Sequence, residues 1–389
     1  MPFSASRVAP SKVLSAFDYK PRTRVIFGPG TLSQLGDLVH ELKGTRVLLV
    51  TDNGLDEVGH ADRGREVLES SGLNVTVFDD VHPNPTSDDV EACVKVAREQ
   101  ETDFIVGLGG GSSMDCAKGA NFILTNGGQM SDYKGVGLAT KPMLPMIAVP
   151  TTAGTGSEAQ SFALIADPKT HMKMACGDPK AACRAAILDP ELTLTMPHPV
   201  AAATGIDAVT HAIESFVCTR RNPVSQLFSR QAWALLAGSL PAVFEEPANI
   251  DARGAVLLGA HLAGSAIENS MLGAAHALAN PLTAHFGLTH GYAVGLMLPH
   301  VIRFNAEEVG NEYAGLAAEV GARGAEGLAE HVSSLLNLMG LPTSLSQTQF
   351  DANLIPTLAE EAAQQWTGRF NPRTIDEPEQ FAELYHNAV

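Results

Sequence analysis

The chain has 389 residues, of which 45% are hydrophobic, and its formal net charge is −17. This length and apolar content allow a sizeable core and predict two or three domains. The negative charge argues against nucleic acids and anionic membrane surfaces as partners, and no run of about 18 uncharged apolar residues predicts a membrane span.

The cysteines and the first residues bear on cellular location. The cysteines are odd in number and form no C-x-x-C motif, which favours reduced thiols in the cytoplasm over a disulfide framework. They are Cys93, Cys116, Cys176, Cys183 and Cys218. The first twenty residues hold basic and serine residues with no acid before Asp18, a composition that transit peptides share. We interpret them as a frayed N-terminus and predict a cytoplasmic protein.

The first half of the chain alternates strand-like and helix-like segments. Strand-like runs occupy residues 24–27, 46–51, 74–79, 103–108, 145–150 and 186–190, and helical periodicity occupies 32–42, 63–71, 90–99 and 114–122. This alternation predicts a mostly parallel sheet covered by helices, with ligands at the carboxyl ends of the strands. Residues 161–165 and 172–175 are predicted to form a hairpin around Asp167 and Pro168.

The residue pattern of the sequence changes near Met196, after which strand-like runs are scarce. Segments rich in alanine and leucine with helical period follow at 199–216, 224–240, 250–269, 272–286, 292–304, 328–339, 356–367 and 377–386. We therefore predict an α/β, Rossmann-like nucleotide-binding domain over residues 1–196 and an all-α metal-binding domain over residues 197–389.

Two of the predicted strands end in residues that suit a nucleotide. Asp52 follows the strand at 46–51, where a carboxylate can accept hydrogen bonds from ribose hydroxyls and repel the 2′-phosphate of NADP. Gly109, Gly110, Gly111 and Ser112 lie between a strand and a helix, where free backbone N–H groups can bind phosphate. On the sequence alone, an ordinary turn explains Asp52 equally well.

Two further turns are less specific. The strand at 145–150 leads into small and hydroxyl-bearing residues from Thr151 to Glu158, which permit a close approach and supply hydrogen-bond donors. The Pro83-Asn84-Pro85 segment is a rigid turn before a helix with Thr86 or Ser87 as its cap. Unaided, either segment fits a plain turn.

Asp207 and His211 are four residues apart, a spacing that places both side chains on one face of a helix, one turn apart. A carboxylate and an imidazole in this arrangement form half of a site for a divalent ion of the iron or zinc type. The alternative is an exposed or capping pair, which is the more frequent meaning of this spacing.

His276 and His290 can supply the other half of such a site. An unbroken helix of fourteen residues would hold them about 21 Å apart, so the chain must fold back between them, and Pro281 and the segment 287–289 offer the breaks. The spacing does not choose between these histidines and three others nearby, His261, His285 and His300.

The segment from Ala203 to Ser215, with Gly273-x-x-His276 and His290-Gly291, resembles the metal signature of the iron-containing (group III) alcohol dehydrogenases. The resemblance extends from about Val25 to about Arg373. It implies a dehydroquinate-synthase-like architecture in which one divalent ion, Fe(II) in preference to Zn(II), is held by Asp207, His211, His276 and His290.

The resemblance also implies NAD as cofactor, with NADP less favoured. It places the following residues at the cofactor: Asp52, Asn84, Gly109, Gly110, Gly111, Ser112, Thr151, Thr152, Thr155, Leu164 and Lys173. This sequence departs from the family at Asn280, where the family usually has a histidine four residues after the third ligand.

The implied function is metal-dependent, NAD(P)-linked interconversion of a primary or secondary alcohol and its aldehyde or ketone, with the metal polarising the substrate oxygen. The implied partners are a small-molecule substrate and further copies of the chain. Rival interpretations are a maleylacetate-reductase-like oxo-acid reductase, a polyol dehydrogenase of the glycerol dehydrogenase type, a non-redox lyase of the dehydroquinate-synthase type, and a pure binding protein.

Overall fold

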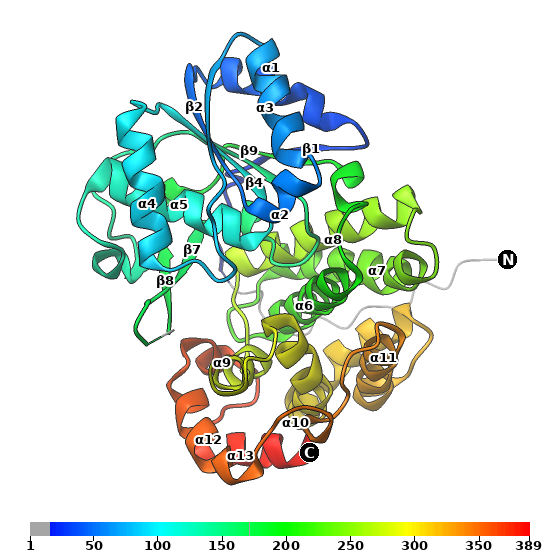
Figure 1. Cartoon of the computed structure of the whole chain (residues 1–389). Coiled ribbons are helices and arrows are strands. Elements are labelled where there is room, and N and C mark those ends of the chain that lie inside the picture. The colour runs from blue at the N-terminus through cyan, green and yellow to red at the C-terminus, as the bar shows by residue number, and fades with distance from the viewer. Residues whose placement is uncertain (1–15, 171) are drawn as a thin grey trace, which may run out of the picture.

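The computed structural model describes residues 16–170 and 172–389, and it contains a sheet with helices on both faces and a separate group of helices (Figure 1). The sheet and its helices, coloured blue to green, lie above the later helices, coloured green to red, in this view. Most of the N-terminal segment that we interpret as frayed lies outside the described residues.

The main sheet has six strands, and all of them are parallel. Its strands in spatial order are β1 (Arg24–Phe27), β9 (Ala185–Leu188), β6 (Met146–Pro150), β4 (Phe104–Gly109), β2 (Arg46–Val50) and β3 (Asn74–Phe78). Each strand overlaps a predicted one, and the apolar runs of β2, β4, β6 and β9 match the nearly continuous burial of the inner strands of a parallel sheet.

Helices cover both faces of this sheet. They are α1 (Leu35–Glu41), α2 (Asn53–Glu57), α3 (His60–Ser70), α4 (Ser87–Glu99) and α5 (Gly111–Asn126). Successive side chains of a strand point to opposite faces, so Leu48 and Val50 of β2 join the core under α4 and α5. The intervening Val47 and Leu49 join the core under α1 and α3.

A second, smaller sheet extends from this part of the chain. It consists of β5 (Gly135–Val136), β8 (Lys173–Gly177) and β7 (Phe162–Ala166), in that order. Strands β7 and β8 pair antiparallel with Ala166 opposite Lys173, so the predicted hairpin is confirmed.

The later part of the chain is helical. Its helices are α6 (His198–Val217), α7 (Pro223–Glu245), α8 (Ile250–Glu268), α9 (Ala274–Phe286), α10 (His290–Glu319), α11 (Gly324–Leu338), α12 (Ile355–Gln364) and α13 (Pro378–Asn387). Helix α6 packs against α7, α8 and α10 and is buried along most of its length. The predicted fold class, a mostly parallel α/β part followed by an all-α part, is confirmed. Within the described ranges, no helix combines the length and apolar character that crossing a membrane requires.

The chain reversal between His276 and His290 occurs at one of its two predicted breaks. Helix α9 runs through Pro281 without ending, and it stops at Gly287, whose φ of 64° is left-handed. The prediction that Pro281 breaks the chain is therefore wrong. Buried neighbours hold α9 around this proline, and tertiary packing of this kind outweighs the single backbone hydrogen bond that a proline removes.

Packing in the helical core makes Trp233 of α7 important for stability. This side chain is fully buried and donates its Nε1–H to the Leu316 carbonyl at 2.9 Å. Trp233→Ala should lower the free energy of unfolding by about 3–5 kcal/mol, as measured by urea denaturation followed by circular dichroism. On the same helix, Leu227 is 69% exposed, and Leu227→Ala should change that free energy by less than about 0.5 kcal/mol. Equal effects of the two substitutions would contradict the packing described here.

Candidate metal and nucleotide site

Helix α6 presents three titratable side chains on one face, because Asp207, His211 and Glu214 recur at helical spacing. All three are buried. The His211 Nε2 atom lies 3.4 Å from Asp207 Oδ1, so the predicted juxtaposition of carboxylate and imidazole is present.

The turn at Gly287 brings His276 of α9 and His290, the first residue of α10, next to this face. The Nε2 atom of His276 lies 3.6 Å from Asp207 Oδ1, and the rings of His276 and His290 have centroids 5.6 Å apart. One ligand atom from each of Asp207, His276 and His290 lies within 4.8 Å of the other two. Three ligands of one small ion require separations of this size.

His211 lies beside this group but does not converge on the same point. Its ring stacks on that of His276, with centroids 4.9 Å apart and planes inclined by 16°. Three of the four predicted ligands therefore share a compact geometry, and the fourth contacts the same carboxylate oxygen.

Several polar atoms of this cluster are buried without a hydrogen-bond partner. They include Asp207 Oδ1 and His276 Nε2, together with the Nδ1 atoms of His211 and His290. Leaving such atoms unpaired costs about 1–3 kcal/mol each, and native proteins rarely leave them unpaired. A divalent ion bound by Asp207 Oδ1 and His276 Nε2 would satisfy both of these atoms. The donor set therefore fits a metal of the iron or zinc type.

The electrostatics of the cluster favour the metal-binding forms of Asp207 and His290, whereas they favour the protonated form of His276. Burial raises the pKa of Asp207, but the neighbouring imidazoles outweigh burial and hold that pKa well below its usual range. Burial and the Lys173 ammonium lower the pKa of His290 to about 3, so its imidazole is neutral. Burial also lowers the pKa of His276, but Glu214 and Asp207 raise it to about 9 overall.

Glu214 supports the third ligand, a role that our sequence analysis missed. Its Oε2 atom accepts a hydrogen bond from His276 Nδ1 at 2.6 Å, and its Oε1 atom accepts one from the Ala275 N–H at 2.7 Å. The first contact directs His276 Nε2 toward Asp207, and such carboxylate partners fix the tautomer of metal-binding histidines. A side chain at Gly273 would place its Cβ 3.0 Å from Glu214 Oε1. The sequence contained a signal for this role, because Glu214 lies seven residues after Asp207 and therefore on the same face of the helix.

The other histidines near this region have separate partners. His261 Nδ1 lies 3.2 Å from Glu158 Oε1, and His285 Nε2 lies 2.9 Å from a carboxylate oxygen of Glu361. Burial lowers the pKa of His300 to about 4. Among the described residues, none of these three joins the cluster around Asp207.

The predicted phosphate loop lies at the carboxyl end of β4. Gly109 has a φ of 153°, and a Cβ there would lie 2.3 Å from Ser113 Oγ, so only glycine fits. Helix α5 begins at Gly111, which leaves the first N–H groups of the helix at this edge of the sheet. The Thr151 N–H donates to the Gly109 carbonyl at 3.0 Å, which joins this loop to the end of β6.

Asp52 and Asn84 lie beside this loop. Asp52 caps α2 by accepting from the Leu55 N–H at 3.3 Å, and its other oxygen accepts from Ser113 Oγ at 3.0 Å. The Asn84 N–H donates to Ser112 Oγ at 3.2 Å, and Asn84 has a left-handed φ of 56°. Both predicted cofactor residues therefore contact the first turn of α5.

Thr152 and Thr155 face the same glycines. A Cβ at Gly110 would lie 3.4 Å from Thr152, and one at Gly111 would lie 2.7 Å from Thr155 Cγ2. The two predicted nucleotide loops thus pack directly on one another.

The hairpin of β7 and β8 carries the last two predicted cofactor residues. Residues that pair across antiparallel strands lie on the same face, and the register places Leu164 and Lys173 together on the exposed face. Partial desolvation lowers the pKa of Lys173, while the carboxylates of Asp115 and Asp207 oppose that shift.

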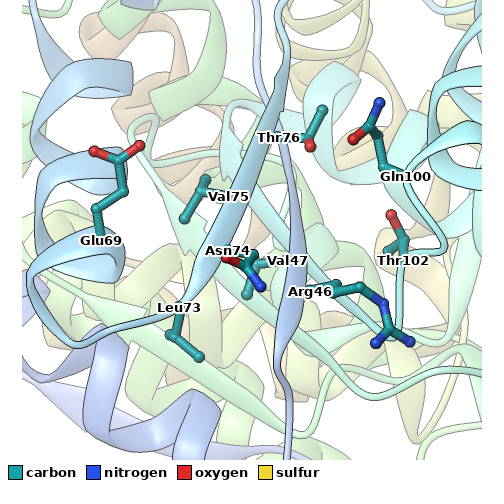
Figure 2. Close-up of a pocket in the computed structure, with 9 residues that line it drawn as sticks. All are labelled: Arg46, Val47, Glu69, Leu73, Asn74, Val75, Thr76, Gln100 and Thr102. Atoms are coloured by element: carbon teal, nitrogen blue, oxygen red, sulfur yellow. The ribbon is translucent and has the colours of Figure 1, made fainter.

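A polar surface pocket lies at the opposite edge of the sheet (Figure 2). Its lining includes the first residues of β2 and β3, Arg46 and Asn74, whereas the loops described above follow the carboxyl ends of the strands. Arg46 is already paired with Asp103 at 3.4 Å. The pocket therefore takes no part in the predicted site.

Comparisons with known proteins agree with this geometry. Residues 21–190 match the family model of the iron-containing alcohol dehydrogenases, and residues 201–389 match the C-terminal model of the same family. The 1,3-propanediol dehydrogenase of Citrobacter freundii is 35% identical over 382 residues, which cover 96% of this chain and 98% of that relative.

Two solved structures are similar over almost the whole chain. That of a 1,3-propanediol oxidoreductase has a TM-score of 0.93 at 32% identity and covers 96% of this chain and 100% of its own. The sulfoacetaldehyde reductase of Bifidobacterium kashiwanohense, solved in complex with NAD+, has a TM-score of 0.88 at 29% identity, with coverage of 96% and 99%.

This chain belongs to the iron-containing alcohol dehydrogenase family. It is an oxidoreductase that interconverts an alcohol and its aldehyde with NAD and a divalent metal as cofactors. The family and function that the motifs predict are confirmed at this level.

The role of Glu214 predicts a specific loss of metal affinity. Two N–H donors meet its two carboxylate oxygens, and a glutamine offers only one acceptor oxygen. Glu214→Gln should weaken Zn(II) binding about 10–100-fold in competition titrations with a chelator. Glu383 is exposed on α13, and Glu383→Gln should leave the affinity unchanged. Wild-type affinity in Glu214→Gln would contradict the supporting role.

The raised pKa of His276 predicts that metal binding depends on pH. Below about pH 9 this imidazole carries a proton in the metal-free protein, and a metal ligand must be neutral. Affinity should therefore rise about tenfold per pH unit between about pH 7 and pH 9 and then level off. Calorimetry in two buffers of different ionisation enthalpy should detect one proton released per ion at about pH 7.5, and no release would contradict this assignment.

Proposed function

We propose that Asp207, His211, His276 and His290 hold one divalent ion, Fe(II) in preference to Zn(II), and that this ion activates the alcohol substrate. The observation that carries the proposal is the cluster of buried, unpaired ligand atoms on α6, α9 and α10. Asp207 remains ionised because electrostatic interactions with the three neighbouring imidazoles compensate for its lost hydration. A divalent ion supplies the Lewis acidity that stabilises the oxygen anion of an alcohol at neutral pH.

We further propose that NAD lies across the carboxyl end of the sheet. Its pyrophosphate rests on the loop of Gly109 to Ser112, where the first N–H groups of α5 are free. Asp52 faces the adenosine ribose, which favours NAD over NADP. The remaining contacts of the nucleotide are with Asn84, Thr151, Thr152, Thr155, Leu164 and Lys173. The contacts that gather these residues around the start of α5 and beside the metal cluster support this placement.

In the proposed reaction, hydride passes from the substrate carbon to the nicotinamide, and the hydroxyl proton is released. One NAD+ and one alcohol give one NADH, one aldehyde or ketone, and one proton. The protein aligns the two reactants and excludes competing reactions, while the nicotinamide accepts the hydride. The Asp207 carboxylate acts on the pKa of Lys173 in the hairpin, which supports a nicotinamide position between the hairpin and α6.

The remaining proposals concern organisation and location. We propose a boundary between the two domains at residues 196 and 197, supported by the end of the last strand at Leu188 and the start of α6 at His198. We propose a homo-oligomer, supported by the edge strand β1, whose Val25 and Phe27 are largely exposed. A cytoplasmic location is supported by five buried cysteines, all free thiols.

The proposal predicts metal-dependent NAD+ reduction by short alcohols and diols. Metal-free protein should be inactive, and Fe(II) or Zn(II) added under anaerobic conditions should restore turnover measured as NADH absorbance. His276→Ala should lose at least about a hundredfold of that activity because a metal ligand is removed. His285→Ala changes an exposed histidine on the same helix that pairs with Glu361, and it should keep wild-type activity.

Three outcomes would overturn the proposal. Full activity in His276→Ala with added metal would exclude the proposed ion. Metal and NAD binding with turnover only on an unsaturated oxo acid would move the function to a maleylacetate-reductase-like enzyme. Binding with no net NADH formation from any substrate would move it to a lyase of the dehydroquinate-synthase type.

A further inference from the structure

The loop between β6 and β7, residues Thr151 to Ser161, contacts both halves of the proposed site. On the nucleotide side it packs on the glycine turn through Thr155, whose Cγ2 atom would lie 2.7 Å from a Cβ at Gly111. Ser157 also donates to Asp115 Oδ1 at 2.7 Å and accepts from Lys118 Nζ at 2.8 Å. These contacts fix the loop to α5, the helix whose N-terminus faces the proposed pyrophosphate.

The same loop packs directly on the helix that carries two metal ligands. A Cβ at Gly154 would lie 2.4 Å from Thr204 Cβ and 2.7 Å from Thr204 Cα, so the bare backbone of the loop lies on α6. Thr204 is three residues before Asp207. The loop therefore lies against α6 within one helical turn of Asp207.

Helix α8 holds the loop from a third side. Gly156 has a φ of 61°, and a Cβ at Gly264 would lie 2.6 Å from its carbonyl oxygen. Three residues away on α8, His261 faces Glu158, and both side chains are buried. At the end of α8, Glu268 accepts from the Ser161 N–H at 2.9 Å and from Ser161 Oγ at 2.7 Å. The loop therefore has little freedom to move independently of either half.

We propose that this loop couples the two cofactor sites, so that bound nucleotide strengthens metal binding and bound metal strengthens nucleotide binding. The inference rests on the proposed function, since it needs both ligands at the assigned residues. A nucleotide on Thr151 to Thr155 orders the loop that packs on α6, the helix of Asp207 and His211. A metal bound on α6 orders the same packing surface for the nucleotide.

The sign and size of the coupling follow from this shared segment. The first ligand fixes the loop together with the two halves that it joins, so the second ligand loses less conformational entropy on binding. Coupling between two sites commonly changes affinity about 5–150-fold, and thermodynamic linkage requires the same factor in both directions. We expect a factor of about ten here.

The test uses ADP-ribose, which lacks the nicotinamide and therefore removes any direct contact between that ring and the ion. Calorimetry measures its affinity for the metal-free wild-type protein and for the Zn(II)-loaded protein. The reverse titration measures Zn(II) affinity with and without ADP-ribose, corrected for binding of Zn(II) to free ADP-ribose. The expected result is a tenfold gain in each direction.

Variants locate the route of coupling. Gly264→Ala directs a methyl group at the Gly156 backbone without touching a proposed ligand residue, and it should reduce the coupling factor at least fivefold. Ser161→Ala deletes one hydrogen bond to Glu268 and should reduce the factor by a smaller amount, which serves if Gly264→Ala does not fold. The matched control is Gly238→Ala on α7, where a Cβ would meet nothing within 4 Å, and its coupling should equal that of the wild type.

The outcomes separate the coupling from the function on which it rests. Equal ADP-ribose affinity with and without Zn(II) in the wild type would overturn the coupling while leaving both sites in place. Wild-type coupling in folded Gly264→Ala and Ser161→Ala would overturn the loop as its route. Failure of either ligand to bind would overturn the proposed function and the coupling with it.

Discussion

A carboxylate can be buried only where nearby charges or donors replace its lost hydration, and Asp207 has three imidazoles for this purpose. His211 lies on the same helix, and His276 and His290 come from two later segments because the chain reverses at Gly287 between α9 and α10. One oxygen of this carboxylate and one nitrogen of His276 still have no hydrogen-bond partner. A cation between them would satisfy these two atoms, and the packing of the helical half holds these groups in place.

Side chains and backbone from separate segments position the proposed ligands. Glu214 of α6 holds His276 and also accepts from the backbone at the start of α9, so one side chain joins two helices. The loop after β6 lies on α6 through Gly154 and on the glycine turn through Thr155. The parallel sheet places the ends of β2, β4 and β6 at one edge, which brings the proposed nucleotide site beside the metal cluster. The α/β half thus supplies the proposed nucleotide site, and the helical half supplies the proposed metal ligands.

Local sequence patterns predicted much of this because they report burial directly. The continuous apolar run of 46–51 and the helical period of 199–216 encode which side chains face a core, and the corresponding strand and helix are present. The predicted proximity of Asp207 and His211 is present in the structure, because a helix fixes the relative position of residues four apart. The choice of His276 and His290 over His261 and His285 was not available from spacing, since it depends on the partners Glu158 and Glu361 from distant segments. The tolerance of Pro281 inside α9 likewise depends on packing that no local pattern contains.

X-ray absorption at the metal edge tests the central claim most directly, because it reads the ligand atoms around a bound ion. In Zn(II)-loaded protein, the account predicts one shell of nitrogen and oxygen neighbours at about 2.0–2.2 Å with the multiple scattering of several imidazoles. His276→Ala should remove one imidazole from that shell. A shell with sulfur at about 2.3 Å, or one with oxygen neighbours and no imidazole, would contradict the assignment of Asp207 and its histidines as the metal centre.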